Sequence, residues 1–247
     1  MESTHTCLSV NINKIALIRN SRGGNLPDLV QMACDLEAYG AEGITVHPRP
    51  DQRHVRYDDI PALKAAIRTE LNVEGYPSAE FIRLVIDNQP AQVTLVPDPP
   101  AALTSDHGWD IQKDAQLLQE VIANFKSAGI RVSLFIDPDE NQVKAAYGVG
   151  ADRIELYTGP YAHTYATDRA AAIDPHIIAS LTATELGLGV NAGHDLNLNN
   201  LAWYRWSLPA LDEVSIGHAM IADALYFGYS NVMHMYKDRL IHPQHYI

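Results

Sequence analysis

The chain has 247 residues, with 30 Asp and Glu against 18 Lys and Arg, which gives a formal net charge of −12. This excess of acid argues against a nucleic-acid partner and against binding to an anionic membrane surface, although a local cationic cluster in a cleft still suits a small anion. No apolar run approaches the roughly 18–20 residues of a membrane span and no signal peptide is recognisable, so we expect a soluble cytoplasmic protein. The two cysteines, Cys7 and Cys34, are expected to be buried, reduced thiols.

Strand-like and helix-like segments alternate along the whole chain. Short runs rich in β-branched and apolar residues predict strands at 7–12, 43–46, 72–75, 92–96, 130–136, 152–157, 188–191 and 213–216. Helical periodicity, with Ser or Asp at several starts and Gly at several ends, predicts helices at 29–39, 60–71, 78–88, 110–128, 139–148, 168–186, 198–206 and 218–240.

Eight strands that alternate with helices imply a parallel sheet, and eight such units in about 250 residues imply a closed (β/α)8 barrel with extra helices. We expect a single domain over residues 1–247. The rival fold is an open, doubly wound sheet, but no Gly-x-Gly-x-x-Gly turn follows the first strand.

The stretch 43–54 is the most informative part of the sequence. A short buried strand ends there in a loop that carries His47, Arg49, Arg53 and His54, stiffened by two prolines. A stiff loop with cationic groups at the end of a strand suits an anionic ligand, with a titratable imidazole beside it. A surface turn with solvated charges is the alternative that this stretch alone leaves open.

The other predicted strands bring further polar residues to the same end of the barrel, where such barrels hold their active sites. They are Asn11, Asn13, Lys14, Arg19 and Arg22 after strand 1, Glu74 in strand 3, Thr104 after strand 4, Glu155 in strand 6, Asn191, His194 and Asp195 at strand 7, and Gly217 and His218 after strand 8. The strand interiors themselves are expected to be apolar. Several histidines, two glutamates and several arginines on one face indicate an enzyme that uses acid–base chemistry.

Glycines follow strands 7 and 8, at positions where barrels build phosphate sites from loop amides and a helix N-terminus. Gly193 and Gly217 therefore predict a phosphorylated small-molecule substrate, although each could simply permit a tight turn. No Cys-x-x-Cys, His-Glu-x-x-His or Walker loop occurs, and the histidines lack a tight ligand spacing. We therefore expect no structural metal.

Taken together, these phrases resemble the pyridoxine 5'-phosphate synthase family of vitamin B6 biosynthesis, from residue 8 to about 240. The matching stretches are Ser9-Val-Asn-Ile, Arg19-Asn-Ser-Arg-Gly, Gly43-Ile-Thr-Val-His-Pro-Arg, Arg53-His, Leu95-Val-Pro, Val132-Ser-Leu-Phe-Ile-Asp, Arg153-Ile-Glu-Leu-Tyr-Thr-Gly, Val190-Asn-Ala-Gly-His and Ser215-Ile-Gly-His-Ala. The resemblance implies a transferase that assembles as a homo-octamer and needs no redox cofactor. Its reaction condenses 3-amino-2-oxopropyl phosphate with 1-deoxy-D-xylulose 5-phosphate to give pyridoxine 5'-phosphate, phosphate and water.

The resemblance also implies a role for individual residues. His47 and Glu74 would accept protons, His194 would donate one, and Glu155 would stabilise the transition state. The aminoketone phosphate would be held by Asn11, Arg22, Gly217 and His218, and the sugar phosphate by Arg49, His54 and Thr104. The substrate-binding set also includes Asn13, Lys14 and Asp195. Here the chain departs from the pattern, because many relatives have Asp-His in place of Asn13-Lys14 and Gly in place of Asp195.

Two other functions stay open at this point. One is another phosphate-binding barrel enzyme, such as a sugar-phosphate aldolase or an enzyme like thiamine-phosphate synthase. A Schiff-base aldolase needs a desolvated lysine on a strand, and the predicted strands contain none. The other is a non-catalytic protein that binds phosphorylated metabolites, which the presence of His47, Glu74, Glu155 and His194 disfavours.

Overall fold

The computed structural model describes residues 5–98 and 105–247, and within them eight parallel strands close into a barrel in chain order. The last strand pairs with the first, with Ser215 opposite Ser9, which completes the ring. The strands are β1 (Cys7–Asn11), β2 (Gly43–Val46), β3 (Glu70–Gly75), β4 (Gln92–Leu95), β5 (Arg131–Ile136), β6 (Arg153–Tyr157), β7 (Gly189–Gly193) and β8 (Glu213–Ile216). The predicted (β/α)8 barrel is confirmed.

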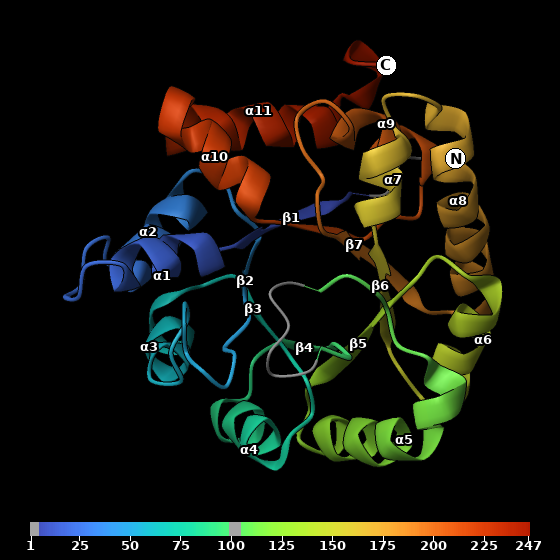
Figure 1. The fold of residues 1–247 in the computed structure, drawn as a ribbon, viewed down its shortest axis with the longest axis horizontal. Helices are drawn as coiled ribbons and strands as arrows, with labels where there is room; N and C mark the ends of the chain where they lie inside the picture. Colours follow the sequence, from blue (N-terminus) through green and yellow to red (C-terminus); the bar gives the residue numbers. More distant parts are fainter. Residues whose placement is uncertain (1–4, 99–104) are drawn as a thin grey trace.

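The helices surround the strands (Figure 1). They are α1 (Asn13–Asn20), α2 (Leu29–Ala38), α3 (Asp59–Ala66), α4 (Ala79–Asn88), α5 (Ile111–Ser127), α6 (Glu140–Gly148), α7 (Gly159–Thr164), α8 (Arg169–Leu186), α9 (Leu201–Ser207), α10 (His218–Phe227) and α11 (Tyr229–Ile241), followed by a short 3-10 turn, Pro243–His245. Four residues predicted to begin helices act as N-caps instead: Ser78, Asp110, Asp139 and Asp168 each accept a backbone N–H of the first turn.

Some predicted boundaries are wrong for local reasons. The helix predicted over 60–71 ends near Ile67, whose backbone is already extended, because Glu70 begins β3 by pairing with Gly43 of β2. The helix predicted over 218–240 is two helices. Gly228, with φ of 75° and ψ of 149°, separates α10 from α11 in a conformation that suits glycine.

Two short helices, α1 and α7, lie in segments where no helix was predicted. Helix α1 has only eight residues, too few to show a clear helical period, yet Ile15 and Ala16 are buried on one side of it. Helix α7 begins directly after Thr158 and has only six residues, too few to show a helical period.

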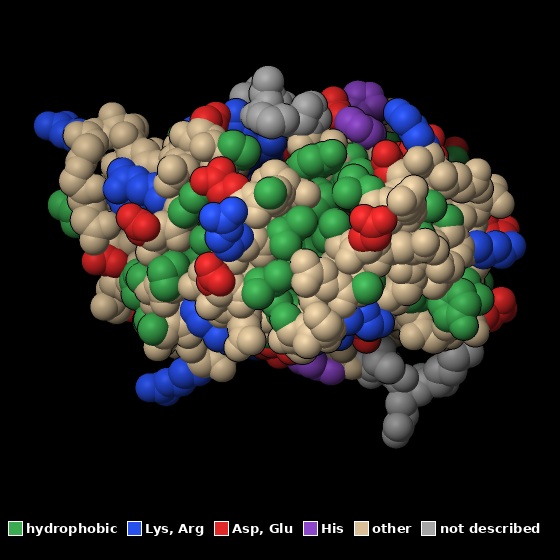
Figure 2. Space-filling view, turned by 90° about the horizontal axis from the view of Figure 1, so that it is seen from below, with side chains coloured by type: hydrophobic (Ala, Val, Ile, Leu, Met, Phe, Trp, Pro, Cys, Tyr) green, Lys and Arg blue, Asp and Glu red, His purple; other side chains and the backbone are tan. Residues whose placement is uncertain are grey.

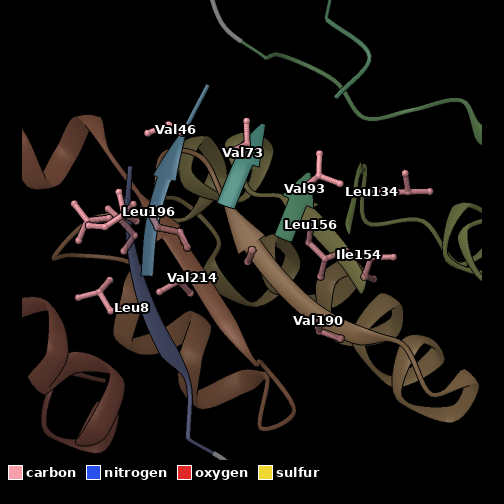
Figure 3. Packing of buried hydrophobic residues seen from close by; sticks show 14 of the residues in the cluster. Leu8, Val46, Val73, Val93, Leu134, Ile154, Leu156, Val190, Leu196 and Val214 are labelled. Carbon is pink, nitrogen blue, oxygen red and sulfur yellow. The ribbon is translucent and has the colours of Figure 1, made fainter. Parts of the chain in front are cut away.

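The hydrophobic core lies between the barrel and the surrounding helices. Alternate strand residues such as Leu8, Val73, Leu134 and Ile154 are fully buried and belong to this layer (Figure 3). Side chains alternate between the two faces of a strand, so the residues between these positions line the inside of the barrel. The apolar layer therefore holds the fold together from outside the ring.

The inside of the barrel is polar, contrary to the expected apolar strand interiors. Asn191 on β7 reaches across to Gln92 on β4, with 3.5 Å between Nδ2 and Oε1. Between the neighbouring strands β4 and β3, the Thr94 hydroxyl donates to Asn72 Oδ1 at 3.0 Å. Such hydrogen bonds lower the free-energy cost of burying polar side chains, although Gln92 Nε2, Ser133 Oγ and Glu155 Oε2 have no hydrogen-bond partner among the described residues.

The surface mixes charges of both signs. On the face seen in Figure 2, Lys and Arg side chains are scattered among acidic side chains and hydrophobic ones. Both cysteines are free, but they are half-buried rather than fully buried. None of the helices in residues 5–98 and 105–247 combines the length and the apolar character that a membrane span requires.

Candidate active site

Most of the predicted site residues lie at the carboxyl ends of the strands. They end a strand, follow it directly or begin the next helix: Asn11, Asn13, His47, Glu74, His194, Asp195, Gly217 and His218. Glu155 lies deeper, in the middle of β6, and its carboxyl is buried in the polar interior. Thr104 lies outside the described residues.

His47 and Glu74 face each other on neighbouring strands. His47 Nδ1 is 3.9 Å from Glu74 Oε2, and Asn11 Nδ2 approaches the same oxygen at 3.5 Å, so neither contact is a strong hydrogen bond. The Asn13 side chain accepts the backbone N–H of His47 at 2.9 Å. Asn11 in turn accepts the N–H of Asn13 at 3.1 Å. This chain fixes the start of the loop after β2 against β1.

Burial shifts the protonation of both groups. Desolvation, followed by the positive charge of Arg49, holds the pKa of His47 well below its ordinary value. His47 is therefore neutral at pH 7 and able to accept a proton. The pKa of Glu74 is raised well above the ordinary value for a carboxyl, first by burial and then by Glu155 and Asp98. A carboxyl with a raised pKa is a strong base once it has lost its proton.

Glu155 is a buried acid held in a tight space. Burial, with the charge of Glu213 as a smaller cause, raises the pKa of Glu155 to about 8, against a hydrogen bond from the Thr94 side chain that lowers it. Its Oε2 is buried and has no hydrogen-bond partner in the described part of the chain. A Cβ atom on Gly193 would lie 2.2 Å from Glu155 Oε1. Gly193 is thus needed for space beside the carboxyl, and not for a positive φ.

Arg49 belongs to a buried ion pair. Its Nη2 donates to Asp98 Oδ2 at 2.7 Å, and the Ser105 hydroxyl donates to the same oxygen at 2.6 Å. Both Arg49 and Asp98 are almost fully buried, so the pair is held in a low-dielectric setting. Asp98 and Ser105 were not predicted. Asp98 is thus joined to Arg49 in the loop after β2, and Ser105 is joined to Asp98.

His54 is positioned as a neutral donor. The backbone N–H of Val55 donates to His54 Nδ1 at 3.0 Å, so the proton of the neutral ring is on Nε2. Burial and then the charge of Arg49 lower the pKa of His54 to about 4, and Lys14 contributes to this shift. The Lys14 side chain itself is exposed.

The turn after β7 has an unusual backbone. His194 and Asp195 have φ of 86° and 54°, a left-handed conformation that costs free energy for residues other than glycine. The Thr158 hydroxyl donates to the carbonyl oxygen of Gly193 at 2.8 Å and also contacts the carbonyl oxygen of His194. Two consecutive residues of positive φ thus follow directly on the end of β7.

The Asp195 carboxylate points back at the preceding imidazole. Asp195 Oδ2 is 3.4 Å from His194 Nδ1, and the interaction with this imidazole is the main cause of a lowered pKa for Asp195. The other face of the ring meets Tyr157, with 5.4 Å between ring centroids in an edge-on arrangement. Tyr157 and Thr158 were missed in the sequence, although both lie in the matched stretch at the end of β6.

A cavity of about 360 Å³ opens beside the ends of β7 and β8. Its lining includes Gly217 and His218 at the start of α10, together with Asp195, Asn197 and His163. A Cβ atom on Gly217 would lie 3.1 Å from the Cβ of Asn11, so this glycine also permits close packing. The cavity lies where the glycines predicted a phosphate site.

Two predicted cations are not part of this group within the described chain. Arg19 is buried and pairs with Asp59 at 2.7 Å, which makes it a structural residue. Arg22 is exposed in the connection between α1 and α2, which projects from the body of the molecule in Figure 1. Arg22 is not among the residues that line the cavity beside Gly217, and no hydrogen bond or ion pair links Arg22 to another described residue.

A barrel with buried acid–base groups and cationic groups at the carboxyl ends of its strands defines an acid–base enzyme of the (β/α)8 class. Comparison with known proteins is more specific. The family model described as "Pyridoxal phosphate biosynthesis protein PdxJ" matches residues 8–242. The chain belongs to this family, the pyridoxine 5'-phosphate synthases, and is an enzyme of vitamin B6 biosynthesis.

Curated relatives are similar over almost their full length. Pyridoxine 5'-phosphate synthase of Cytophaga hutchinsonii is 57% identical over 235 residues, which cover 95% of this chain and 99% of that protein. The synthase of Porphyromonas gingivalis is 54% identical with the same coverage. The resemblance seen in the sequence motifs is therefore confirmed.

Solved structures with low sequence identity share the fold alone. Phosphoribosylanthranilate isomerase from Thermotoga maritima matches with a TM-score of 0.59 at 11% identity, over 96% of this chain and 98% of that one. A protein of Aquifex aeolicus matches with a TM-score of 0.61 at 12% identity, over 98% of this chain and 93% of that one.

Proposed function

We propose that this enzyme condenses 3-amino-2-oxopropyl phosphate with 1-deoxy-D-xylulose 5-phosphate and releases pyridoxine 5'-phosphate, inorganic phosphate and water. One observation in the structure supports this best. A neutral imidazole, His47, and two buried carboxyls of raised pKa, Glu74 and Glu155, lie together at one end of the barrel. A condensation that repeatedly moves protons between carbon, nitrogen and oxygen needs several such groups.

The four acid–base groups take different roles in this proposal. His47 is neutral and accepts a proton. Glu74 acts as a base after the cationic amine of the first substrate stabilises its carboxylate, because a nearby positive charge lowers a carboxyl pKa. Glu155 remains largely protonated at pH 7 and donates a hydrogen bond from its buried position to developing negative charge. His194, with Asp195 on Nδ1, donates a proton to the leaving oxygen.

The two phosphates occupy different parts of the site. The aminoketone phosphate lies in the cavity beside Gly217 and His218, with Asn11, which packs against Gly217, as a further ligand. The family resemblance also implies Arg22 as a ligand, although Arg22 does not line this cavity in the structure. The sugar phosphate lies beside the loop after β2. There Arg49 supplies charge and neutral His54 donates from Nε2. The family resemblance adds Thr104, outside the described residues, to this set. Lys14 and Asn13 lie beside the sugar phosphate, and Asp195 lies beside the aminoketone phosphate.

The decisive experiment supplies both substrates together and then each one alone. We expect pyridoxine 5'-phosphate, identified by absorbance and mass, with one inorganic phosphate released per product, only when both are present. Absence of the product from well-folded protein would refute the proposal. A Schiff-base aldolase is disfavoured because none of the eight strands in the described chain carries a lysine. Borohydride trapping of a substrate on Lys14 would reinstate that alternative.

We further propose that the enzyme is a cytoplasmic transferase that assembles as a homo-octamer, with no nucleic-acid or membrane partner. Support for assembly comes from large apolar side chains exposed at the end of α10: Leu225, Tyr226 and Phe227 are 76%, 85% and 51% exposed. Exposed apolar surface of this kind marks interaction sites. Light scattering of the purified protein should give eight times the mass of 27.3 kDa for one chain. A monomer at micromolar concentration would contradict this.

A further inference from the structure

Three side chains of the types that bind transition metals meet at the amino-terminal end of the barrel, away from the active site. His5, Cys7 and Glu42 each offer one ligand atom, and these atoms all lie within 4.8 Å of one another. Spacing along the chain predicted no structural metal, because the histidines show no tight ligand motif. The fold changes this by bringing Glu42, from the turn between α2 and β2, against the start of β1.

The backbone holds the two parts of this group in place. His5 and Cys7 are two residues apart on an extended chain, so their side chains point to the same side. Thr6 points the other way, and its hydroxyl donates to the Leu211 carbonyl at 2.7 Å. The N–H of Cys7 donates to the Asp212 carbonyl at 2.8 Å. These bonds anchor the segment to the end of the barrel next to β8.

Glu42 is fixed from the other side. Its backbone N–H donates to the Leu8 carbonyl at 2.9 Å, and its Oε2 accepts the N–H of Leu8 at 3.2 Å. Lys237 also approaches Oε2, at 3.8 Å. The other carboxylate oxygen, Oε1, therefore faces His5, whose Nε2 lies 2.5 Å away. One oxygen is used to orient the carboxylate and the second is directed at the cluster, as in carboxylates that ligate metals.

We propose that His5 Nε2, Cys7 Sγ and Glu42 Oε1 form a binding site for Zn²⁺ or a similar borderline divalent cation. One imidazole, one thiolate and one carboxylate are ligands that zinc accepts, whereas Mg²⁺ and Ca²⁺ require oxygen. Zinc bonds of about 2.0–2.3 Å place tetrahedral ligand atoms about 3.4–3.7 Å apart. His5 therefore turns slightly away from Glu42 to admit the ion, which its exposed side chain allows.

The bound ion joins the segment before β1 to the turn before β2. Both lie at the opposite end of the barrel from His47 and Glu74, so the ion takes no direct part in the acid–base chemistry there. Three protein ligands leave a fourth position for water. Because the folded chain binds the ion and the unfolded chain lacks the assembled site, zinc raises the melting temperature, and the rise grows with the logarithm of the free zinc concentration above Kd.

The test uses untagged, chelator-treated protein and Co²⁺ as a spectroscopic probe. We expect one Co²⁺ per chain, a thiolate-to-cobalt charge-transfer band in the near ultraviolet, and loss of the band when Zn²⁺ is added. Cys7→Ser should remove the band. His5→Ala and Glu42→Gln should each weaken Co²⁺ binding by more than about tenfold. Loss of even a residue that only orients a metal ligand lowers metal affinity about 10–100-fold. Cys34→Ser is the matched control, because Cys34 contacts the Ala66 carbonyl far from this group.

Zinc should also raise the melting temperature of the wild-type and Cys34→Ser proteins and leave that of Cys7→Ser unchanged. The proposal is overturned if the wild-type protein shows no charge-transfer band with Co²⁺ in excess, or if the band survives in Cys7→Ser. Equal zinc-induced shifts in the wild-type and Cys7→Ser proteins would also overturn it, because they would assign the bound zinc to other groups.

Discussion

The clearance beside Glu155 makes Gly193→Ala a sharp test of the active-site geometry. The new Cβ would lie 2.2 Å from Glu155 Oε1, whereas ordinary van der Waals contact begins at 3.4 Å. The carboxyl oxygen must therefore retreat by about 1.2 Å, the difference between these distances. A misplacement of about 1 Å in a catalytic group can lower the rate about 100-fold. We expect Gly193→Ala to lower kcat by about two orders of magnitude.

The fold should survive the substitution. The nearest atom belongs to the end of a side chain rather than to the backbone, so overpacking should cost no more than about 1–3 kcal/mol, or roughly 10 °C in Tm. Gly148→Ala is the matched control, because a Cβ atom there meets nothing within 4 Å. Steady-state phosphate release and thermal unfolding give both quantities. If Gly193→Ala kept kcat within about twofold of wild type, the position of the Glu155 carboxyl would not matter and the reasoning would fail.

Four further predictions concern neighbouring residues. Glu74→Gln should lower kcat by about 10²–10⁴-fold with little change in substrate binding; wild-type turnover would show that Glu74 is not a base. Lys14→Ala should raise KM for the sugar phosphate about ten- to a hundredfold and leave KM for the aminoketone phosphate nearly unchanged, whereas equal small effects would remove Lys14 from the site. Crystals soaked in phosphate should hold the anion beside Gly217 and His218, and an anion found only elsewhere would contradict the assigned cavity. Because the folded state keeps a proton on Glu155 up to about pH 8 and the unfolded chain loses it near pH 4.5, the stability contribution of this group should fall between these pH values by roughly 4 kcal/mol at most. Between pH 5 and pH 8, urea unfolding should therefore show a smaller loss in the free energy of unfolding for Glu155→Gln than for wild type. Identical losses in the two proteins would show that the pKa of Glu155 is not raised.

The fold was predictable because β/α alternation is a local signal. Each strand is a short apolar or β-branched run, and the caps at Ser78, Asp139 and Asp168 are visible in the sequence. The polar interior was missed because single buried polar residues inside such runs do not reveal which neighbours satisfy them. Asn191 meets Gln92 across 99 residues of chain, and no local pattern records that contact.

The candidate site was predicted in part for the same reason. Strand ends are fixed by topology, so His47, Glu74 and His194 were placed at one end of the barrel from sequence alone. Asp98 was missed because its significance depends on Arg49, 49 residues earlier in the chain. The function of Gly193 was also hidden, because it depends on the space that the Glu155 carboxyl occupies on the adjacent strand.

The polar inside of the barrel has a consequence for how the sequence can change. In β3, Val73 faces the apolar layer while Glu74 faces the interior, and the same alternation holds in β6 for Ile154 and Glu155. Substitutions scanned along one strand should therefore alternate, position by position, between those that lower stability and those that lower turnover. Residues that face the barrel interior can therefore change while those that face the apolar layer stay constant. The interior can acquire new chemistry in this way without loss of stability from the apolar layer.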